Sequence, residues 1–185
     1  MKDSFGAPRT SRHCATVTLP NVFSGPTHHV LNGLRPSKFE VNYLSEDVLV
    51  EGLLSCLKKG SRWGPVQVTR EFYYLRGRTD VVALTLSGDV VAFEAKLTKW
   101  RWALHQAYRN TCFAHSSYVV LPPQTALRAF RHAVEFERRH VGLCSVFEDG
   151  IVVLLDAPRV EPIQPWLTRR SISDSGAGGI VAHSA

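Results

Sequence analysis

Two short apolar runs, Val81 to Leu84 and Val90 to Phe93, constrain most strongly how this chain can fold. Each run is apolar at every position, which is typical of strands that are buried on both faces of a sheet. The residues Ser87-Gly88-Asp89 between the runs favour a tight turn. The sequence therefore predicts an antiparallel hairpin at the centre of a covered sheet.

Charged residues stand at the ends of both strands. Asp80 directly precedes the first strand, and Glu94-Ala95-Lys96 ends the second. Residues two apart on a strand point to the same face, so Glu94 and Lys96 project together. Charged strand ends on a solvated hairpin are common, but a carboxylate and an ammonium group beside buried strands are costly unless they serve a function.

The register of the hairpin decides whether Asp80 joins this pair. If the loop is Ser87 to Asp89, Leu86 pairs with Val90, and Asp80 falls opposite Lys96. Asp80 then also lies diagonal to the glutamate of the second strand, on the same face. We therefore expect two carboxylates and one ammonium group to converge.

These three groups suit the hydrolysis of a phosphodiester with a divalent cation. Mg²⁺ prefers oxygen ligands and is usually held by one or two carboxylates together with waters and substrate phosphate. Asp80 and Glu94 are the expected metal ligands, with the backbone carbonyl of Ala95 as a third. Lys96 can orient or deprotonate the attacking water, or neutralise the phosphate, and the sequence leaves these roles open.

An Asp, a hairpin and a Glu-x-Lys tripeptide resemble the motif of the PD-(D/E)XK nuclease superfamily, which has the restriction-endonuclease-like fold. Asp80, Glu94 and Lys96 occupy the motif positions, and Thr79 stands in place of the proline that names it. The resemblance extends over about residues 45–156. It implies cleavage of nucleic acid, usually DNA, that depends on Mg²⁺, for which Mn²⁺ can substitute.

The helix expected before the hairpin runs from Ser45 to Leu57, with Ser45 as N-cap. Glu46 lies near the centre of its apolar stripe and Glu51 lies well off it, so Glu46 should point inward. The resemblance makes Glu46 an accessory acid for a second metal or for a water on the metal. The alternative is an acid that only complements the helix dipole.

A second helix is expected from Thr98 to about His115. Family members often carry a glutamine on this helix, and Gln106 could hold a water or a phosphate oxygen near Lys96. An ordinary solvated glutamine is the alternative. The expected core stripe of this helix is Trp100, Ala103, Leu104, Ala107, Thr111 and Ala114.

A net charge of +6 and a pI near 9.4 favour a polyanionic partner. Basic faces are often merely solvated, so we assign phosphate contact only near the motif. The expected nucleic-acid-binding residues are Arg78, Lys99, Arg101, Trp102 and Arg109.

The remaining pattern predicts an α/β fold with a central mixed sheet flanked by helices. A strand at 117–121, a helix at 124–140 and a closing hairpin at 143–155 follow the second helix. The expected core is αβββαβ with a further helix and this hairpin. We place an irregular N-terminal arm at 1–39, the nuclease-like domain at 40–158 and a Pro-, Ser- and Gly-rich tail at 159–185.

The four cysteines are isolated and form no CxxC pair, which fits a reducing cytoplasmic protein. No apolar run is long enough to span a bilayer, so no membrane association is expected. The leading function is a DNA endonuclease. The alternatives are a nucleic-acid-binding or assembly subunit without catalysis, and a ribonuclease, since nothing reads a 2′-hydroxyl recognisably. Rare-site recognition would need a homodimer or a partner protein.

Overall fold

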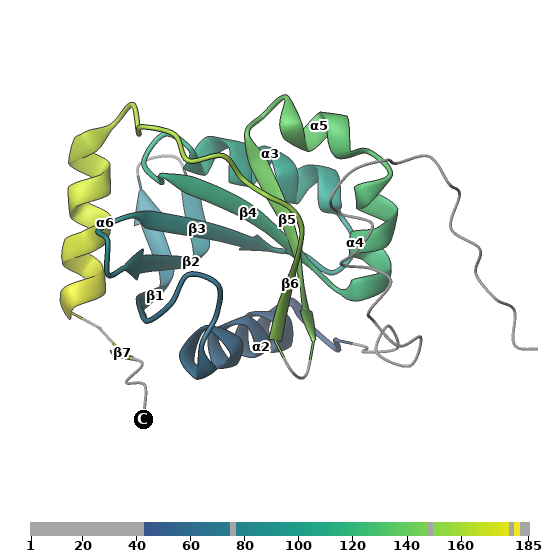
Figure 1. The fold of residues 1–185 in the computed structure, drawn as a ribbon, viewed down its shortest axis with the longest axis horizontal. Coiled ribbons are helices and arrows are strands. Elements are labelled where there is room, and N and C mark those ends of the chain that lie inside the picture. Colours follow the sequence, from purple (N-terminus) through teal and green to yellow (C-terminus); the bar gives the residue numbers. More distant parts are fainter. Residues whose placement is uncertain (1–42, 75–76, 148–149, 178–179, 182–185) are drawn as a thin grey trace, which may run out of the picture.

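The computed structural model describes residues 43–74, 77–147, 150–177 and 180–181. They form an α/β fold in which helices flank a mixed sheet, as the sequence predicts (Figure 1). The expected N-terminal arm at 1–39 lies outside the described residues. No helix in the described part of the chain is long and apolar enough to cross a membrane.

The sheet has seven strands in the order β6-β5-β4-β3-β2-β1-β7. The β3–β4 and β4–β5 pairs are parallel, and all other neighbouring pairs are antiparallel. Parallel neighbours need crossover connections, which helices supply after β3 and β4. The strands are β1 Val66–Tyr74, β2 Gly77–Thr85, β3 Val90–Ala95, β4 Ser116–Leu121, β5 Val141–Phe147, β6 Gly150–Leu155 and β7 Ile180–Val181.

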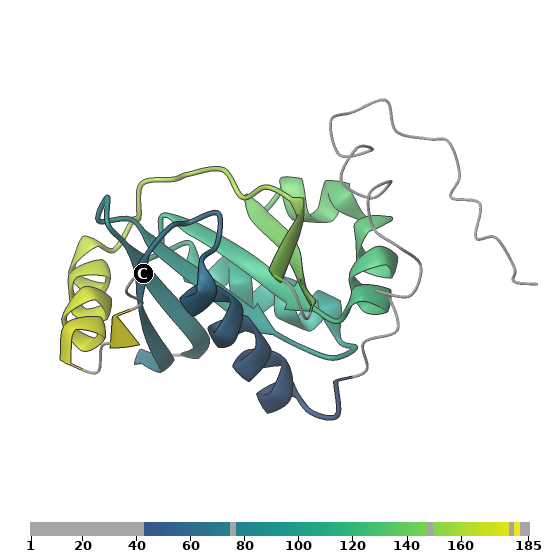
Figure 2. The ribbon, with the colours of Figure 1, turned by 60° about the horizontal axis from the view of Figure 1, so that its bottom comes forward.

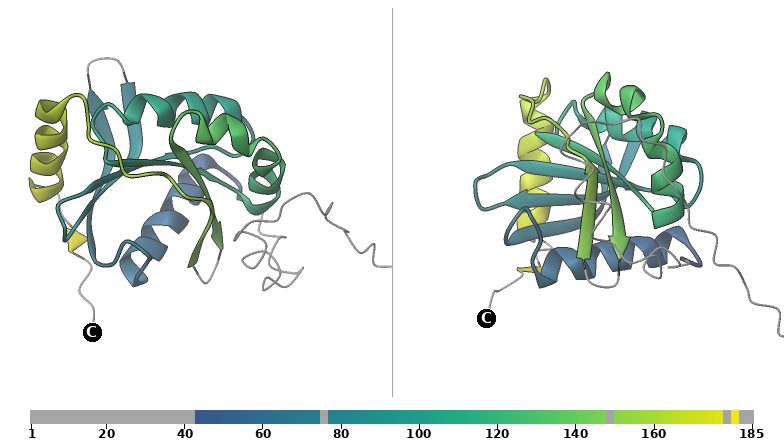
Figure 3. Two further views of the ribbon diagram at one scale, coloured as in Figure 1. Left: turned by 45° about the horizontal axis from the view of Figure 1, so that its top comes forward. Right: turned by 45° about the vertical axis from the view of Figure 1, so that its right-hand side comes forward.

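Helix α2 (Glu46–Lys59) covers one face of the sheet, and the other helices cover the opposite face (Figures 1, 2 and 3). The Ser45 hydroxyl caps α2 by accepting a hydrogen bond from Val48 N at 3.2 Å. Two acids in the first turn and two lysines in the last complement the helix dipole. The helices of the other face are α3 Trp100–Asn110, α4 Pro123–Phe130, α5 Ala133–Glu137 and α6 Pro165–Ala177.

The β2–β3 hairpin forms, but its register differs from the expected one by two residues. Leu84 pairs with Val90, so Asp80 falls opposite Glu94 and not opposite Lys96. The loop keeps three residues but begins at Leu86, because Gly88 supplies the positive φ of 85° at the last loop position. A shift of two residues preserves the face of every side chain, so the expected convergence survives.

In the β1–β2 hairpin, the alternation of side chains between the two faces of the sheet is interrupted beside Asp80. Val68 packs in the core under α2, and strict alternation would place Phe72 there too. Phe72 instead packs with Val82 and Phe113 in the core on the opposite face. The change occurs at Glu71, whose φ of 57° is uncommon for a residue other than glycine.

Two helices differ from their expected bounds. Helix α3 ends at Asn110, before the expected end near His115, because the chain turns there and His115 N pairs with Val90 O in the sheet. The helix expected at 124–140 is split into α4 and α5 where His132 N bonds back to Ala129 O.

Part of the expected tail at 159–185 belongs to the folded domain. Helix α6 packs Leu167 into the core against the strands of the first hairpin. The helix has no apolar stripe because its buried residues include Thr168, Ser171 and Ser175, whose hydroxyls are satisfied internally. Serine and threonine at the buried positions make the segment resemble a disordered tail in composition. They also remove the apolar periodicity from which the helix could have been predicted.

Candidate active site

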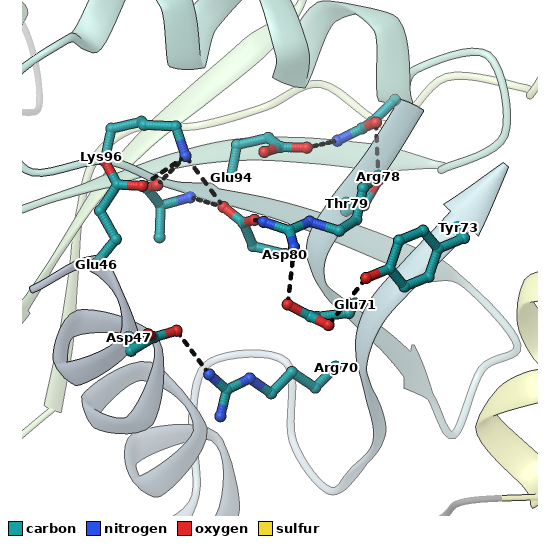
Figure 4. Close-up of polar contacts among 12 residues, drawn as sticks. Glu46, Asp47, Arg70, Glu71, Tyr73, Arg78, Thr79, Asp80, Glu94 and Lys96 are labelled. Atoms are coloured by element: carbon teal, nitrogen blue, oxygen red, sulfur yellow. Dashed lines mark hydrogen bonds and ion pairs between the residues drawn. The ribbon is translucent and has the colours of Figure 1, made fainter. Parts of the chain in front are cut away.

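Strands β2 and β3 separate at the point where the charged residues gather. Their pairing ends at Val81 and Phe93, so the N–H of Ala95 loses the backbone partner that an unbroken ladder would provide at Thr79. Asp80 Oδ2 accepts this hydrogen bond at 2.9 Å (Figure 4). The local separation of the strands therefore fixes the Asp80 carboxylate beside the end of β3.

Lys96 completes the expected convergence. Its Nζ lies 3.6 Å from Asp80 Oδ2 and donates to the backbone oxygen of Ala95 at 2.8 Å. The side chains of Asp80 and Lys96 are only 12% and 13% exposed, so their charges interact with little screening. Lys96 Nζ also donates to Glu46 Oε2 at 3.0 Å. Glu46 points toward the site, as the helical wheel predicts.

Glu51, by contrast, does not contact Lys96 and pairs with Arg70 at the surface. The two acids of α2 therefore have different partners, Lys96 for Glu46 and Arg70 for Glu51. The metal-binding role of Glu46 remains a prediction.

Glu94 is fully buried at the end of β3. Its Oε1 accepts a hydrogen bond from Asn110 Nδ2 at 2.7 Å, and its Oε2 is buried with no hydrogen-bond partner among the described residues. Burial, and then the negative charge of Asp80, raise the pKa of Glu94 to about 8, against the opposing effects of Asn110 and Lys96. A buried acid with one free oxygen beside a second acid is suited to a cation.

Asn110 is a site residue that the sequence analysis missed. Its Oδ1 accepts hydrogen bonds from Tyr74 Oη and Thr79 Oγ1, both at 2.9 Å. These two donors fix the orientation of the amide, so that its NH₂ group faces Glu94. A sequence signal was present, since Asn110 continues the stripe of Ala103 and Ala107.

Replacing Asn110 with aspartate is expected to destabilise the protein by roughly 2–4 kcal/mol at about pH 8, since a carboxylate would replace the donor to Glu94. Tyr74→Phe removes only one donor to the same oxygen and should cost about 1 kcal/mol. Urea unfolding of the metal-free variants measures both. Equal stability of Asn110→Asp and the wild type would show that the amide does not support Glu94.

Gln106 does not contact the site residues through any hydrogen bond in the described part of the chain. Its Oε1 is buried without a partner, one helical turn before Asn110. The amide that contacts the site is that of Asn110, which bonds Glu94 directly. The role expected for Gln106, holding a water or a phosphate oxygen near Lys96, stays a prediction.

The expected nucleic-acid-binding residues fall into two groups. Arg78 lies in the site, where it bonds Glu71 at 2.9 Å and approaches Asp80 Oδ1 to 3.7 Å. The others lie on or just before α3, with Lys99, Arg101 and Trp102 exposed and Arg109 partly buried.

An open cleft of about 300 Å³ leads to Asp80 from the side of α2. It is a mixed-charge cleft, in which arginines alternate with acids. A small polar group can therefore approach Asp80 from solvent. The lining residues are Glu46, Asp47, Val50, Arg70, Glu71, Arg78 and Asp80.

The residues present fit a divalent cation with oxygen ligands. Asp80 and Glu94 are the available carboxylates. The carbonyl oxygen of Ala95, which lies between Glu94 and Lys96 in sequence, accepts a hydrogen bond from Lys96 Nζ. No group of three or more His, Cys, Asp or Glu side chains within the described residues is arranged to hold a metal ion. The remaining ligands would therefore be waters or substrate phosphate, as is usual for Mg²⁺.

No family model matches the chain, and a search of curated proteins finds no match. Among solved structures, the chain is similar to a protein of unknown function from Silicibacter pomeroyi. The similarity has a TM-score of 0.53 at 16% identity and covers 70% of this chain and 85% of that protein. At this identity the similarity concerns the fold alone.

Proposed function

We propose that this protein is a divalent-metal-dependent nuclease with a restriction-endonuclease-like core, acting as an endonuclease on DNA. The observation that carries the proposal is the convergence of Asp80, Glu94 and Lys96 where β2 leaves β3. These residues occupy the positions of the PD-(D/E)XK motif. The element order of helix, antiparallel hairpins, helix and parallel strand supports the same assignment.

Each residue of the site has a role that its contacts support. Asp80 and Glu94 would hold the cation, and Asn110, by bonding Oε1 of Glu94, leaves Oε2 available to it. The cation would supply positive charge that activates water and stabilises the transition state. Lys96 places an ammonium group beside the same carboxylates, where it can orient the attacking water or neutralise a phosphate oxygen.

The net charge of +6 supports a polyanionic substrate. Plasmid DNA, single-stranded and branched DNA, and RNA should therefore be incubated with the protein and Mg²⁺ or Mn²⁺, with and without EDTA. We expect cleavage of DNA that EDTA abolishes. A folded protein that binds the cation and cuts none of these substrates would contradict the proposal.

Asp80→Asn is expected to lower cleavage by about 10²-fold or more, because the variant loses a negatively charged cation ligand. Gel assays of plasmid cleavage measure the effect. Asp156→Asn is the matched control, since Asp156 lies just after the end of strand β6 but is 68% exposed and pairs with Arg62. Full activity of Asp80→Asn would exclude the proposed role.

Glu46→Gln is expected to reduce the cleavage rate by about 10-fold, because Lys96 loses the carboxylate that orients it. Glu51→Gln, on the same helix, should leave the rate unchanged. Titration with Mg²⁺ separates the two interpretations of Glu46. If Glu46→Gln has a lower apparent affinity for Mg²⁺, seen as a higher Mg²⁺ concentration at half-maximal rate, Glu46 is an accessory metal ligand. An unchanged cleavage rate would show that Glu46 only complements the helix dipole.

A further inference from the structure

We infer that one side of α3 binds single-stranded nucleic acid by stacking unpaired bases on aromatic rings. The surface concerned, named here the α3 outer face, consists of Arg101, Trp102, His105, Tyr108 and Arg109. As a statement about substrate this inference rests on the proposed nuclease function, whereas the binding itself does not.

The periodicity of α3 gathers these five side chains on one side. At 3.6 residues per turn they fall within an arc of about 120°. The opposite side is buried against the sheet through Ala103, Leu104 and Ala107. Helix α3 therefore has one side committed to the core and one side that faces outward from the sheet (Figure 1).

The outward side carries aromatic rings that are not packed in the hydrophobic core. Trp102 is 58% exposed and Tyr108 is 51% exposed. The rings of Trp102 and His105 stack with centroids 6.0 Å apart and an angle of 15° between their planes. A row of exposed aromatic rings is an unusual surface for a protein that does not bind a partner there.

The charge of the same surface identifies a polyanion as the partner. Helix α3 has no acidic residue, and Arg101 and Arg109 flank the rings. Arg101 is 60% exposed and pairs with Glu135 at 3.2 Å, a surface pair that a phosphate can replace at small cost. Aromatic rings between basic side chains are the common arrangement of surfaces that bind single strands.

The aromatic rings indicate that the bound nucleic acid is single-stranded. In a duplex the faces of the bases are stacked on one another, and a protein reads base edges through hydrogen-bonding side chains. Only an unpaired strand offers base faces to Trp102 and Tyr108. The substrate expected from this surface is DNA with an unpaired segment beside the bond that is cut.

The α3 outer face reaches the β1–β2 hairpin through Arg109. The Arg109 guanidinium lies 5.9 Å from the centre of the Tyr74 ring, on the β1–β2 hairpin that also carries Arg78 and Asp80. The face therefore ends beside the hairpin that carries two of the site residues.

Fluorescence anisotropy in EDTA tests the binding without cleavage. The full chain is titrated into a labelled oligothymidylate, a duplex of the same length and an abasic strand of the same length. We expect the oligothymidylate to bind most tightly. Trp102→Ala should weaken its binding by roughly 5- to 100-fold and leave the abasic strand unaffected, while Trp102→Phe retains most of the affinity.

Trp166→Ala is the matched control, since Trp166 is 48% exposed on α6. Equal binding of duplex and oligothymidylate, no effect of Trp102→Ala, or the same loss with Trp166→Ala would overturn the inference. Self-association that Trp102→Ala abolishes in sedimentation would also overturn it, because a second copy would then cover the face.

The same experiments separate this inference from the proposed function. Binding that depends on Trp102, without cleavage when Mg²⁺ is added, upholds the inference and counts against the nuclease. Cleavage that is equal for single-stranded and duplex DNA and is unaffected by Trp102→Ala supports the nuclease and counts against the inference.

Discussion

Replacing Lys96 with methionine is expected to reduce cation-dependent cleavage by roughly 10³-fold while cation binding persists. Methionine keeps the length of the side chain and removes the charge that lies 3.6 Å from Asp80. The carboxylates of Asp80 and Glu94 remain, so Mn²⁺ should still raise the melting temperature. Lys96→Arg should not restore activity, because the planar guanidinium cannot occupy the position of a compact ammonium group.

Lys59→Met is the control, because Lys59 is an exposed lysine at the far end of α2. Plasmid cleavage rates and Mn²⁺-dependent melting are measured for each variant. If Lys96→Met cleaves at the wild-type rate, Lys96 has no part in the chemistry. If it loses the Mn²⁺ effect as well, its role is to hold the site together.

The central hairpin could be predicted because its two apolar runs are short, are rich in β-branched residues and are separated by turn residues, which is typical of buried strands. The exact loop position could not, since Ser87-Gly88-Asp89 and Leu86-Ser87-Gly88 are both acceptable three-residue turns. Only the positive φ at Gly88 distinguishes them. The error was harmless for the site, because alternation makes side-chain direction insensitive to a shift of two residues.

The supporting groups of the site were harder to predict than its charges. Asn110 acts through contacts with Tyr74 and Thr79, which lie on other elements and are brought to it only by the fold. The change of faces at Glu71 is likewise a backbone feature without a sequence signature. Local patterns report which residues share a face, whereas the point where β2 leaves β3 depends on how the whole sheet twists.

Replacing Glu94 with glutamine is expected to stabilise the metal-free protein at high pH and to abolish cation binding. Glutamine has nearly the same shape and still offers an oxygen to Asn110 Nδ2. It removes the charge that burial and Asp80 oppose. The charged Glu94 destabilises the metal-free protein and binds the cation. Glutamine at this position should do neither.

The sign of the pH dependence follows from the direction of the shift. The unfolded chain releases the Glu94 proton near the usual pKa of 4.5, whereas the folded protein holds it until about 8. Between these values the folded state binds more protons, so its stability falls as pH rises. Above about pH 8 the penalty is complete and amounts to roughly 2–5 kcal/mol, and below about pH 4.5 it vanishes.

Thermal unfolding in EDTA should therefore show Glu94→Gln melting roughly 5–15 °C above the wild type at about pH 8.5 and close to it at about pH 5. Mn²⁺ should raise the melting temperature of the wild type and leave that of the variant unchanged. Glu137→Gln removes an exposed carboxylate from α5 and should do neither. A variant that is no more stable than the wild type at high pH, or that still responds to Mn²⁺, would mean that Glu94 is not a strained cation ligand.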